Sequence, residues 1–329
     1  MGTPAGRLYR RLEGLFAVYK PPGVHWKLVR DTVETNLLKG INSAPPPAPQ
    51  LQVQFLPERT EGPSGSTELT LTATCLPALA EHPRVTGPRF RKLRVGVGHR
   101  LDAFSSGLLV LAVGQGNKLL TDLYNSHVTR DYTVEGEFGM ATDDFSNTGR
   151  LIERTTYDHI TRDKLERVLA MIQGANQKAL LTYSNVDMSS QEAYELAAKG
   201  SLYPQGKSPP IVTGLRCLHF EPPHFSLEIQ CLHETQRFLC RLVHEVGLEL
   251  RSTSVCTGVR RTRDGPFTLQ MALTRNHWTV PDIAQAIQQS RSSWRQSASR
   301  ASLPQHTESR GGEQGRHGTD EGARVAMSD

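Results

Sequence analysis

The chain has 329 residues, 37% of them hydrophobic, which is enough to bury one large core or two of moderate size. No apolar run approaches the roughly 20 residues of a membrane span, so we expect no membrane contact. A net charge of +5 favours a polyanionic partner such as RNA.

Five cysteines are scattered through the chain, at Cys75, Cys217, Cys231, Cys240 and Cys256. Their number is odd and no two of them form a Cys-x-x-Cys pair. This pattern indicates reduced thiols in an intracellular compartment rather than disulfides or a zinc site. The 12 histidines include no HExxH pattern, so we predict no bound metal.

The N-terminal segment Met1–Glu13 is basic, with arginines at Arg7, Arg10 and Arg11 and no acid before Glu13. Such a segment is compatible with a short transit peptide, and we therefore expect a mitochondrial location, in the matrix.

The next stretch, LFAVYKPPGVHW, predicts a strand over Leu15–Tyr19 that ends at Lys20-Pro21-Pro22-Gly23. Prolines cannot continue a central strand, so the chain must turn there. A lysine beside two prolines is held in one direction, which suits a contact with a phosphate or with the wall of a site.

A Pro-rich connector, Ile41–Gln50, opens a segment that extends to about Arg94. Within this segment Thr67–Cys75 alternates polar and apolar residues, which predicts a strand with one apolar face. At the other end of the chain, residues 288–329 are rich in Ser, Gln, Arg and Gly. We predict that they form a disordered polar tail.

The most distinctive stretch is Val95–Val113, VGVGHRLDAFSSGLLVLAV, because it carries a single carboxylate, Asp102. A Gly-His-Arg approach precedes Asp102, and the predicted strand Leu108–Val113 follows a turn of small residues. A buried carboxylate needs a charged partner, and Arg100 could supply it. Asp102 is therefore a candidate catalytic residue. The alternative is an Asp that caps the next turn.

Helical periodicity is clear in the second half of the chain. Thr161–Gly174 and Thr235–Gly247 each place apolar residues at helical spacing after a Thr and before a Gly. Further strands are predicted at Tyr132–Phe138 and Ser226–Cys231. Strands interleaved with helices in this way predict an α+β fold with a mixed, largely antiparallel sheet flanked by helices.

Five ordered motifs resemble the TruB family of pseudouridine synthases. YKPPG and HRLDAFSSGLLVL resemble the first two motifs of the family, and Asn125–Glu153 resembles the strand and Thr-Asp loop that come next. Tyr183-Ser184 with Gln191–Gly200, and then Val259–Phe267, resemble two later elements. The resemblance implies a pseudouridine synthase catalytic domain, expected over 14–280 with an insertion at about 41–94.

Bacterial TruB enzymes end in a small RNA-binding domain of the PUA type. The C-terminal stretch of this chain is too polar and too short for such a domain, so we expect none.

The resemblance implies an isomerase that converts uridine to pseudouridine in RNA, in tRNA, mRNA or both. One carboxylate carries this reaction, and no cofactor is required. Asp102 falls on the family's catalytic Asp, and Tyr132 falls where the family places a Tyr against the target base. The other residues expected to contact substrate are Lys20, His99, Arg100, Arg237 and Arg241. The expected partner is RNA that presents a uridine in a single-stranded loop or flipped out of a helix.

Binding is expected to be mainly electrostatic, and its affinity should fall steeply with salt. The candidate phosphate contacts are Lys20, Arg100, Arg130 and the cluster Arg260, Arg261 and Arg263. A solvated basic surface is the alternative for any one of them.

Two departures from the TruB pattern bear on activity. Gly98-His99-Arg100-Leu101-Asp102 is two residues shorter than the family motif and resembles the RluA type of synthase. The family's active-site Arg falls on Cys240, so Arg237 or Arg241 is expected to replace it. Two alternatives follow: an RluA-type synthase, and an RNA-binding assembly factor with a degenerate site. A dinucleotide-binding loop is excluded because Leu101 stands where the third Gly is required.

Overall fold

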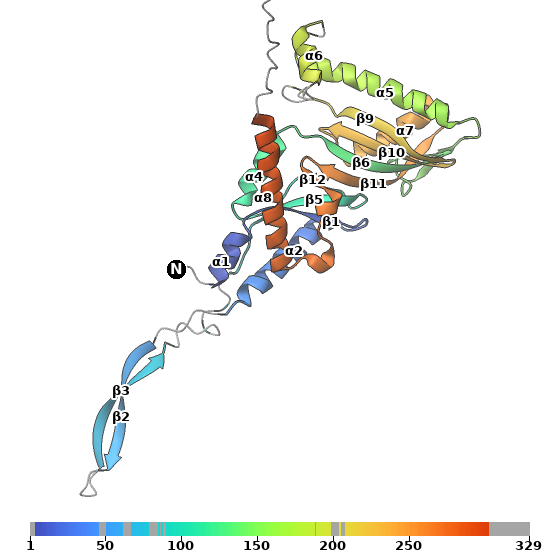
Figure 1. Cartoon of the computed structure of the whole chain (residues 1–329). Coiled ribbons are helices and arrows are strands. Elements are labelled where there is room, and N and C mark those ends of the chain that lie inside the picture. Colours follow the sequence, from blue (N-terminus) through green and yellow to red (C-terminus); the bar gives the residue numbers. More distant parts are fainter. Residues whose placement is uncertain are drawn as a thin grey trace, which may run out of the picture.

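The structure is a computed structural model that describes residues 4–45, 51–61, 67–78, 85, 87, 90–187, 189–198, 204 and 208–302. Its centre is an eight-stranded sheet in the order β1-β5-β11-β6-β10-β9, with β4 beside β5 and β12 beside β11 (Figure 1). The strands are β1 (Gly14–Lys20), β4 (Val95–Val97), β5 (Ser106–Val113), β6 (Arg130–Phe138), β9 (Ile211–Glu221), β10 (His224–Leu232), β11 (Ser254–Asp264) and β12 (Phe267–Thr268).

Within this sheet β5 and β11 run parallel, and the other neighbouring strands pair antiparallel. The predicted mixed, largely antiparallel sheet is therefore confirmed. Each of the four central strands predicted from the sequence lies inside an observed strand, and the observed strands extend them by one or two residues at their ends.

The helices are α1 (Pro4–Arg11), α2 (Trp26–Asn42), α4 (Gly116–Asn125), α5 (Arg162–Tyr183), α6 (Gln191–Ala198), α7 (Gln236–Glu249) and α8 (Val280–Ser302), with short 3₁₀ turns at Leu269–Met271 and Arg275–His277. Thr161 and Thr235 cap α5 and α7 with their side chains, as their positions before the apolar periodicity predict.

The predicted end of α5 at Gly174 is wrong, because the helix continues to Tyr183. An isolated Gly costs a helix only about 1 kcal/mol relative to Ala. Contacts with β9 offset that cost, since the side chains of Gln173 and Asn176 accept hydrogen bonds from the backbone N–H groups of Leu215 and Val212 (both 3.0 Å). The helix thereby covers an edge strand.

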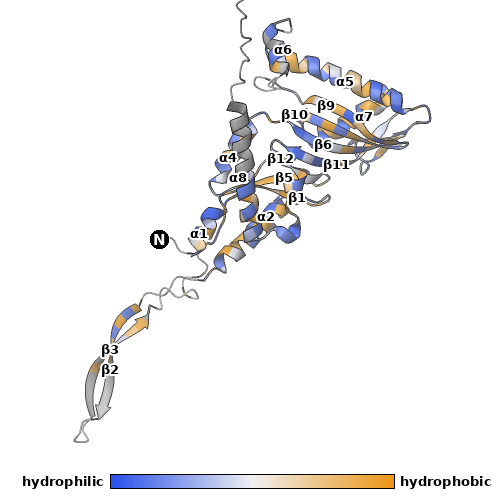
Figure 2. Ribbon diagram, in the orientation of Figure 1, coloured by the Kyte–Doolittle hydropathy of each residue, from blue (hydrophilic) through white to orange (hydrophobic). Residues whose placement is uncertain are grey.

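The two halves of the sheet are covered differently. On the β1–β5 side, α2 and α8 pack on one face and α4 on the other, so all of Gly107–Val113 is buried. On the β6–β10 side, α5 and α7 cover one face, and β6 alternates buried with more exposed residues. Figure 2 shows the same contrast, with hydrophobic colour continuous along β5 and mixed along β6 and β10.

The segment predicted to be an insertion contains a hairpin formed by β2 (Leu51–Glu61) and β3 (Thr67–Pro77), and β3 includes the predicted strand Thr67–Cys75. The two strands pair with each other in a separate sheet, and Figure 1 shows the hairpin projecting away from the main sheet. The connector residues 46–50 lie outside the described residues.

Helices form both ends of the described chain: α1 lies inside the predicted segment 1–13, whereas α8 extends past the predicted start of the tail. The N-terminal segment forms α1, in which Ala5 is buried and Tyr9 stacks on Phe90 (ring centroids 5.4 Å apart). The C-terminal helix α8 crosses the predicted domain end at 280 and the predicted tail start at 288. It does so because Ile283 and Ile287 supply an apolar face that packs on β1. Residues 303–329 of the predicted tail lie outside the described residues.

Among the residues that the structure describes, no helix has the length and apolar character to cross a membrane.

Candidate active site

Asp102 lies at the tip of the loop that joins β4 to β5. Its neighbours Leu101 and Ser105 are fully buried, whereas Asp102 and Ala103 are exposed. The buried residues Leu101 and Ser105 thus hold the two ends of a short exposed segment, which we call the arch. The carboxylate is presented to solvent by a loop whose two sides are fixed in the core.

Lys20, at the end of β1, supports this arch from behind. Its buried ammonium donates hydrogen bonds to the carbonyls of Pro21 (3.0 Å), Ala103 (3.3 Å) and Ser105. Burial lowers the pKa of Lys20 to about 8, although the charge of Asp102 acts in the opposite direction. The Gly23 N–H also donates to the Ala103 carbonyl (2.8 Å). The Lys-Pro-Pro-Gly turn therefore positions the Asp102 loop.

Of the two contacts predicted for Lys20, with a phosphate or with the wall of the site, the arrangement opposes the phosphate contact. All three of its ammonium hydrogens have carbonyl acceptors inside the protein, and the residue has no exposed surface with which to meet a phosphate.

Arg261 holds the other side of the loop. This fully buried residue of β11 donates to the carbonyls of Leu108 (2.8 Å) and His99 (2.7 Å). The approach needs Gly107, which has φ +105° and where a Cβ would lie 2.2 Å from the Arg261 carbonyl oxygen. The Gly that follows the Asp in the sequence motif is therefore required by the close β5–β11 contact.

Gln236, the first residue of α7, joins the loop to that helix. The backbone N–H of Asp102 donates to Gln236 Oε1 (3.3 Å), and Gln236 Nε2 donates to the Arg100 carbonyl (3.3 Å). One amide side chain thus holds the backbone on both sides of Leu101.

A cavity of about 310 Å³ opens in front of Asp102. It is lined by Asp102, Phe104, Ser105, Asp144, Ser146, Thr148, Gln236, Arg237 and Cys240. Two carboxylates, one guanidinium and several hydroxyls therefore converge on one space. The structure brings Asp102, Arg237 and Cys240 together as the sequence predicts.

The second carboxylate of the cavity, Asp144, comes from the loop between β7 (Met140–Thr142) and β8 (Leu151–Arg154). It accepts hydrogen bonds from the backbone N–H of Ser146 (2.9 Å) and from the Ser146 hydroxyl (2.9 Å). Its charge is used to shape its own loop.

Behind the loop lies a buried charged network centred on Glu234, the residue two before α7. Arg130 donates to Glu234 through Nε (2.6 Å) and Nη2 (3.1 Å), and the Tyr132 hydroxyl donates to Glu234 Oε1 (2.7 Å). Burial opposes ionisation of Glu234, but the hydrogen bonds and charge of Arg130 outweigh it and hold the pKa of that carboxyl below its ordinary value.

Tyr132 and His99 both belong to this network. Tyr132 has no exposed surface, and burial raises the pKa of its hydroxyl. His99 lies 4.0 Å from Glu234 and 3.5 Å from an Arg261 nitrogen, and burial together with the Arg130 charge lowers the pKa of His99 to about 4. The imidazole is therefore neutral near pH 7.

Two predicted arginines lie outside the cavity. Arg100 does not pair with Asp102; its guanidinium carbon lies over the ring of Trp26, 4.8 Å from the centroid. Arg241 forms an exposed i,i+4 ion pair with Glu245 (2.9 Å) on another face of α7. Of the two arginines expected to replace the family Arg, the geometry favours Arg237.

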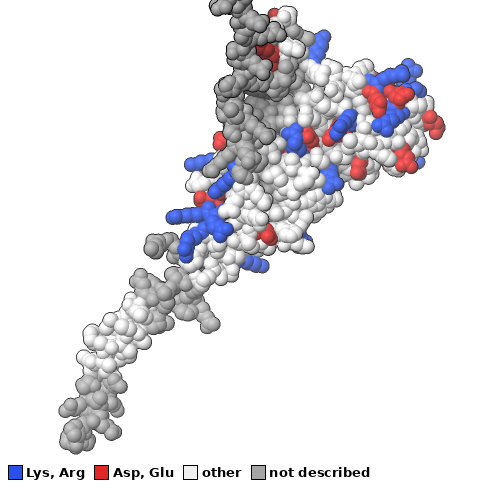
Figure 3. All heavy atoms as spheres, in the orientation of Figure 1, with Lys and Arg blue, Asp and Glu red and all other residues white. Residues whose placement is uncertain are grey.

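The predicted basic cluster is mostly engaged inside the protein. Arg130 and Arg261 are buried, and Arg263 is paired with Asp131 (2.6 Å). On the face shown in Figure 3, basic side chains gather near α1, while acids and bases are mixed near the start of α5. Of the candidate phosphate contacts, Arg100 and Arg260 are the ones that the structure leaves exposed.

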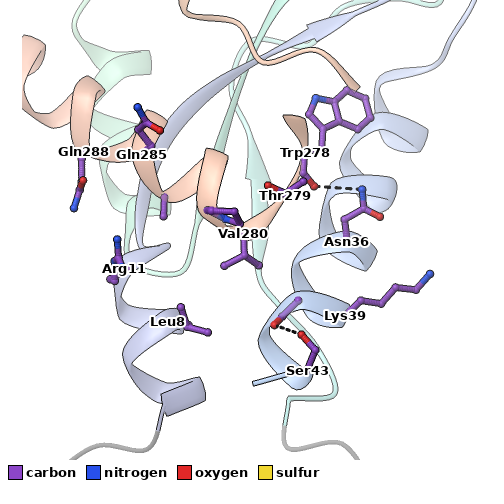
Figure 4. A pocket seen from close by; sticks show the side chains of 13 residues that line it. Leu8, Arg11, Asn36, Lys39, Ser43, Trp278, Thr279, Val280, Gln285 and Gln288 are labelled. Atoms are coloured by element: carbon purple, nitrogen blue, oxygen red, sulfur yellow. Dashed lines mark hydrogen bonds between the residues drawn. The ribbon is translucent and has the colours of Figure 1, made fainter. Parts of the chain in front are cut away.

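A larger cavity, of about 940 Å³, lies between α1, α2 and α8 (Figure 4). Arg11, Lys39 and Gln288 are among its lining residues, and none of the predicted substrate-contacting residues lines it. Its size alone does not make it the reactive site.

Sequence reasoning missed Gln236, Asp144 and Glu234. Glu234 follows His233, which has a positive φ of 56°, but no spacing in the sequence signals its contact with Arg130. The cluster of acids and hydroxyls over 142–148 was a usable signal for Asp144. Within the described residues, no group of three or more His, Cys, Asp or Glu side chains could hold a metal ion.

Known proteins with similar sequences show the family to which the chain belongs. The family model described as "TruB family pseudouridylate synthase (N terminal domain)" matches residues 88–236. Pseudouridylate synthase TRUB2, mitochondrial, of Xenopus tropicalis is 60% identical over 88% of this chain and 89% of its own length. The Homo sapiens protein of that name is 61% identical over 84% of this chain and 83% of its own length.

Among solved structures, the crystal structure of the archaeal box H/ACA sRNP Nop10-Cbf5 complex is similar with a TM-score of 0.45 and 14% identity, over 87% of this chain and 63% of that one. The sequence identities of about 60% with the animal relatives extend over most of both chains. The chain therefore belongs to the TruB family of pseudouridylate synthases.

Proposed function

We propose that the chain isomerises uridine to pseudouridine in RNA and that Asp102 is its catalytic carboxylate. The observation that carries the proposal is the placement of Asp102: an exposed carboxylate on a braced loop, in the wall of a cavity that also contains Arg237. Most other acids of the site are tied up by protein donors, whereas Asp102 is presented outward.

The reaction breaks the N-glycosidic bond, rotates the base and rejoins it through C5. A single carboxylate suffices, either by attacking the substrate covalently or by taking the C2′ proton of the ribose. It must be ionised for either role. Two cations lie near it: the ammonium of Lys20 behind the loop, and the guanidinium of Arg237 in the lining of the same cavity.

The role of Tyr132 against the target base stays a prediction. The ring lies beneath the site, hydrogen-bonded to Glu234 and fully buried, so stacking on it requires the covering side chains to move when RNA binds.

Two further proposals concern partner and location. RNA is the substrate because pseudouridylate synthases of this family act on uridine within it, and a base flipped from the stack can enter a cavity of this size. Two of the relatives are named as mitochondrial, and we propose that this chain is also mitochondrial, in the matrix.

The two alternatives fare differently. Membership of the TruB family rules out the RluA type. An RNA-binding assembly factor with a degenerate site is the second candidate, since Cys240 stands at the place of the family Arg. The presence of Arg237 in the same cavity favours the enzyme.

The test is a turnover assay on unmodified RNA transcripts, with pseudouridine read by mass spectrometry. Asp102→Asn keeps the shape of the side chain but should lower turnover by on the order of 10²–10⁴-fold or more, as expected for loss of a catalytic base or nucleophile. Asp144→Asn is the matched control, because it removes a carboxylate of the same cavity that is already hydrogen-bonded to Ser146. Asp102→Asn with wild-type turnover, or a wild-type chain that converts no uridine, would overturn the proposal.

A further inference from the structure

Arg100 and Trp26 form a stacked pair beside the Asp102 loop. The Arg100 guanidinium carbon lies 4.8 Å from the centroid of the Trp26 ring. Arg100 is exposed, and Trp26 is half-buried at the first turn of α2. Stacking on an aromatic face fixes the plane of a guanidinium while its in-plane N–H groups stay available.

Arg100, like Arg237 of the cavity, differs from most arginines near the site in having no acidic partner within the described residues. Arg30, Arg130, Arg241 and Arg263 each form an ion pair with a carboxylate. No ion pair links Arg100 to an acid in the described part of the chain. The charge is therefore neutralised by no side chain there, although a ring holds it in one orientation.

The pair is rigidly connected to the catalytic loop. The carbonyl of Arg100 accepts a hydrogen bond from Gln236, which also holds the backbone N–H of Asp102. On the Trp26 side, the Gly23 N–H donates to the carbonyl of Ala103 (2.8 Å), the residue after Asp102. These bonds hold the backbone of Arg100 beside that of Asp102, and the contact with the Trp26 ring restricts where the guanidinium can lie.

We propose that Arg100, oriented by Trp26, binds a backbone phosphate next to the uridine that is isomerised, and that Trp26 is a positioning residue for this contact. The inference rests on the proposed function. An orientated guanidinium fork matches two phosphate oxygens, and such a contact fixes the register of the RNA without reading its sequence.

A phosphate fits this place better than a stacked base does. The ring of Trp26 already serves Arg100, and the charged groups of Arg30 (5.6 Å) and Lys27 (5.8 Å) are also near it. Its aromatic surface is occupied by cations. Moving a uridine out of the helical stack costs unstacking energy, and a contact that holds the neighbouring phosphate helps to offset that cost.

The first experiment compares variants in RNA binding and turnover. Arg100→Ala should weaken binding about tenfold, the effect of losing a hydrogen bond to a charged group. It should also reduce the salt dependence by roughly 0.7 in the log–log slope, that of one phosphate contact on a single strand. Trp26→Ala should weaken binding nearly as much, with a rise in KM and little change in kcat, whereas Trp26→Phe, which keeps a ring, should bind RNA like the wild type.

Arg30→Ala is the matched control, because Arg30 lies near the same ring but is paired with Asp31 (2.6 Å). It should leave the salt slope at its wild-type value. If Arg30→Ala weakened RNA binding and lowered the salt slope as much as Arg100→Ala, the effect would come from the general positive charge of this surface and not from the stacked pair.

The second experiment locates the phosphate. The probe is a synthetic RNA stem-loop that contains the uridine converted by the wild-type chain, with a neutral methylphosphonate at one backbone position at a time. A single substitution beside the target uridine should weaken wild-type binding about tenfold and have little further effect in Arg100→Ala.

The failure of this inference is distinct from failure of the proposed function. Wild-type turnover with equal methylphosphonate effects in wild type and Arg100→Ala overturns the phosphate contact alone. If no uridine is converted, the proposed function fails, and the salt dependence of binding to the RNA transcripts still decides the inference: equal slopes for wild type and Arg100→Ala would overturn it.

Discussion

Two carboxylates near the site, Asp102 and Glu234, have opposite environments. Glu234 is buried and accepts hydrogen bonds from Arg130 and from Tyr132. Asp102 is exposed, its backbone N–H is bonded to Gln236, and its nearest support is the ammonium of Lys20 on the far side of the loop. The carboxylate of Glu234 accepts hydrogen bonds from several side chains, whereas Asp102 is held in place through its backbone.

This difference separates structure from reactivity. A carboxylate whose lone pairs are occupied by buried donors stabilises the fold and cannot approach a substrate. A carboxylate whose position is fixed through neighbouring backbone groups keeps its oxygens available. The protein thus uses Glu234 to build the floor of the site and Asp102 to act above it.

Replacing each acid by its amide gives the largest expected contrast. Glu234→Gln leaves the buried Arg130 without its counter-ion and should lower the free energy of unfolding by about 3–5 kcal/mol. Asp102→Asn removes an exposed charge and should change it by no more than about 0.5 kcal/mol. Urea denaturation of the two variants measures both values, and equal losses of stability would contradict the assignment of roles.

Arg237 and Cys240 test which residue now accompanies Asp102. If Arg237 has replaced the family Arg, Arg237→Ala should lower kcat/KM by about 10–100-fold, the effect of a lost hydrogen bond to a charged group. Cys240→Arg should then give no gain, because the cavity already holds a guanidinium. Steady-state kinetics would show the reverse pattern, a strong gain in Cys240→Arg with a neutral Arg237→Ala, if the pairing were absent.

The pH dependence of turnover tests the support that Lys20 gives. Its pKa of about 8 means that the ammonium is charged below that pH and loses its proton above it. The proton loss weakens its bonds to the loop carbonyls, so kcat/KM should fall severalfold as pH rises through about 8. Lys20→Met should have lower activity and lack this alkaline limb. A limb that persists in the variant must come from another group.

The smallest effect is expected at Arg241. Its ion pair with Glu245 is exposed, and such i,i+4 pairs contribute at most about 0.5 kcal/mol. Arg241→Ala should turn over RNA like the wild type, in contrast to Arg237→Ala four residues before it on the same helix. If the two variants lost turnover to the same extent, the effect would come from the total charge of α7 and not from a contact that Arg237 makes in the cavity.

Local pattern in the sequence was sufficient for the central elements. The apolar run Leu108–Val113 and the Thr-capped periodicity of α5 and α7 predicted a strand and two helices, because burial repeats at the period of each element. Asp102 could be singled out for the same reason: it is the one carboxylate between a Gly-rich approach and a buried strand. The family resemblance rested on such local motifs as well.

The partners of the charged residues were decided only by the tertiary structure. Lys20 meets carbonyls 83 and 85 residues away, and Arg130 meets Glu234 across 104 residues. No periodicity links such positions, since the sheet order β1-β5-β11-β6 brings them together through long-range pairing. The sequence by itself determined that Asp102 is presented by a turn between a Gly-rich segment and a buried strand. The packing of β1, β11 and α7 around that turn determined that Lys20 and Arg261 support it from inside the protein, while Arg100 and Arg237 stay exposed and available to RNA.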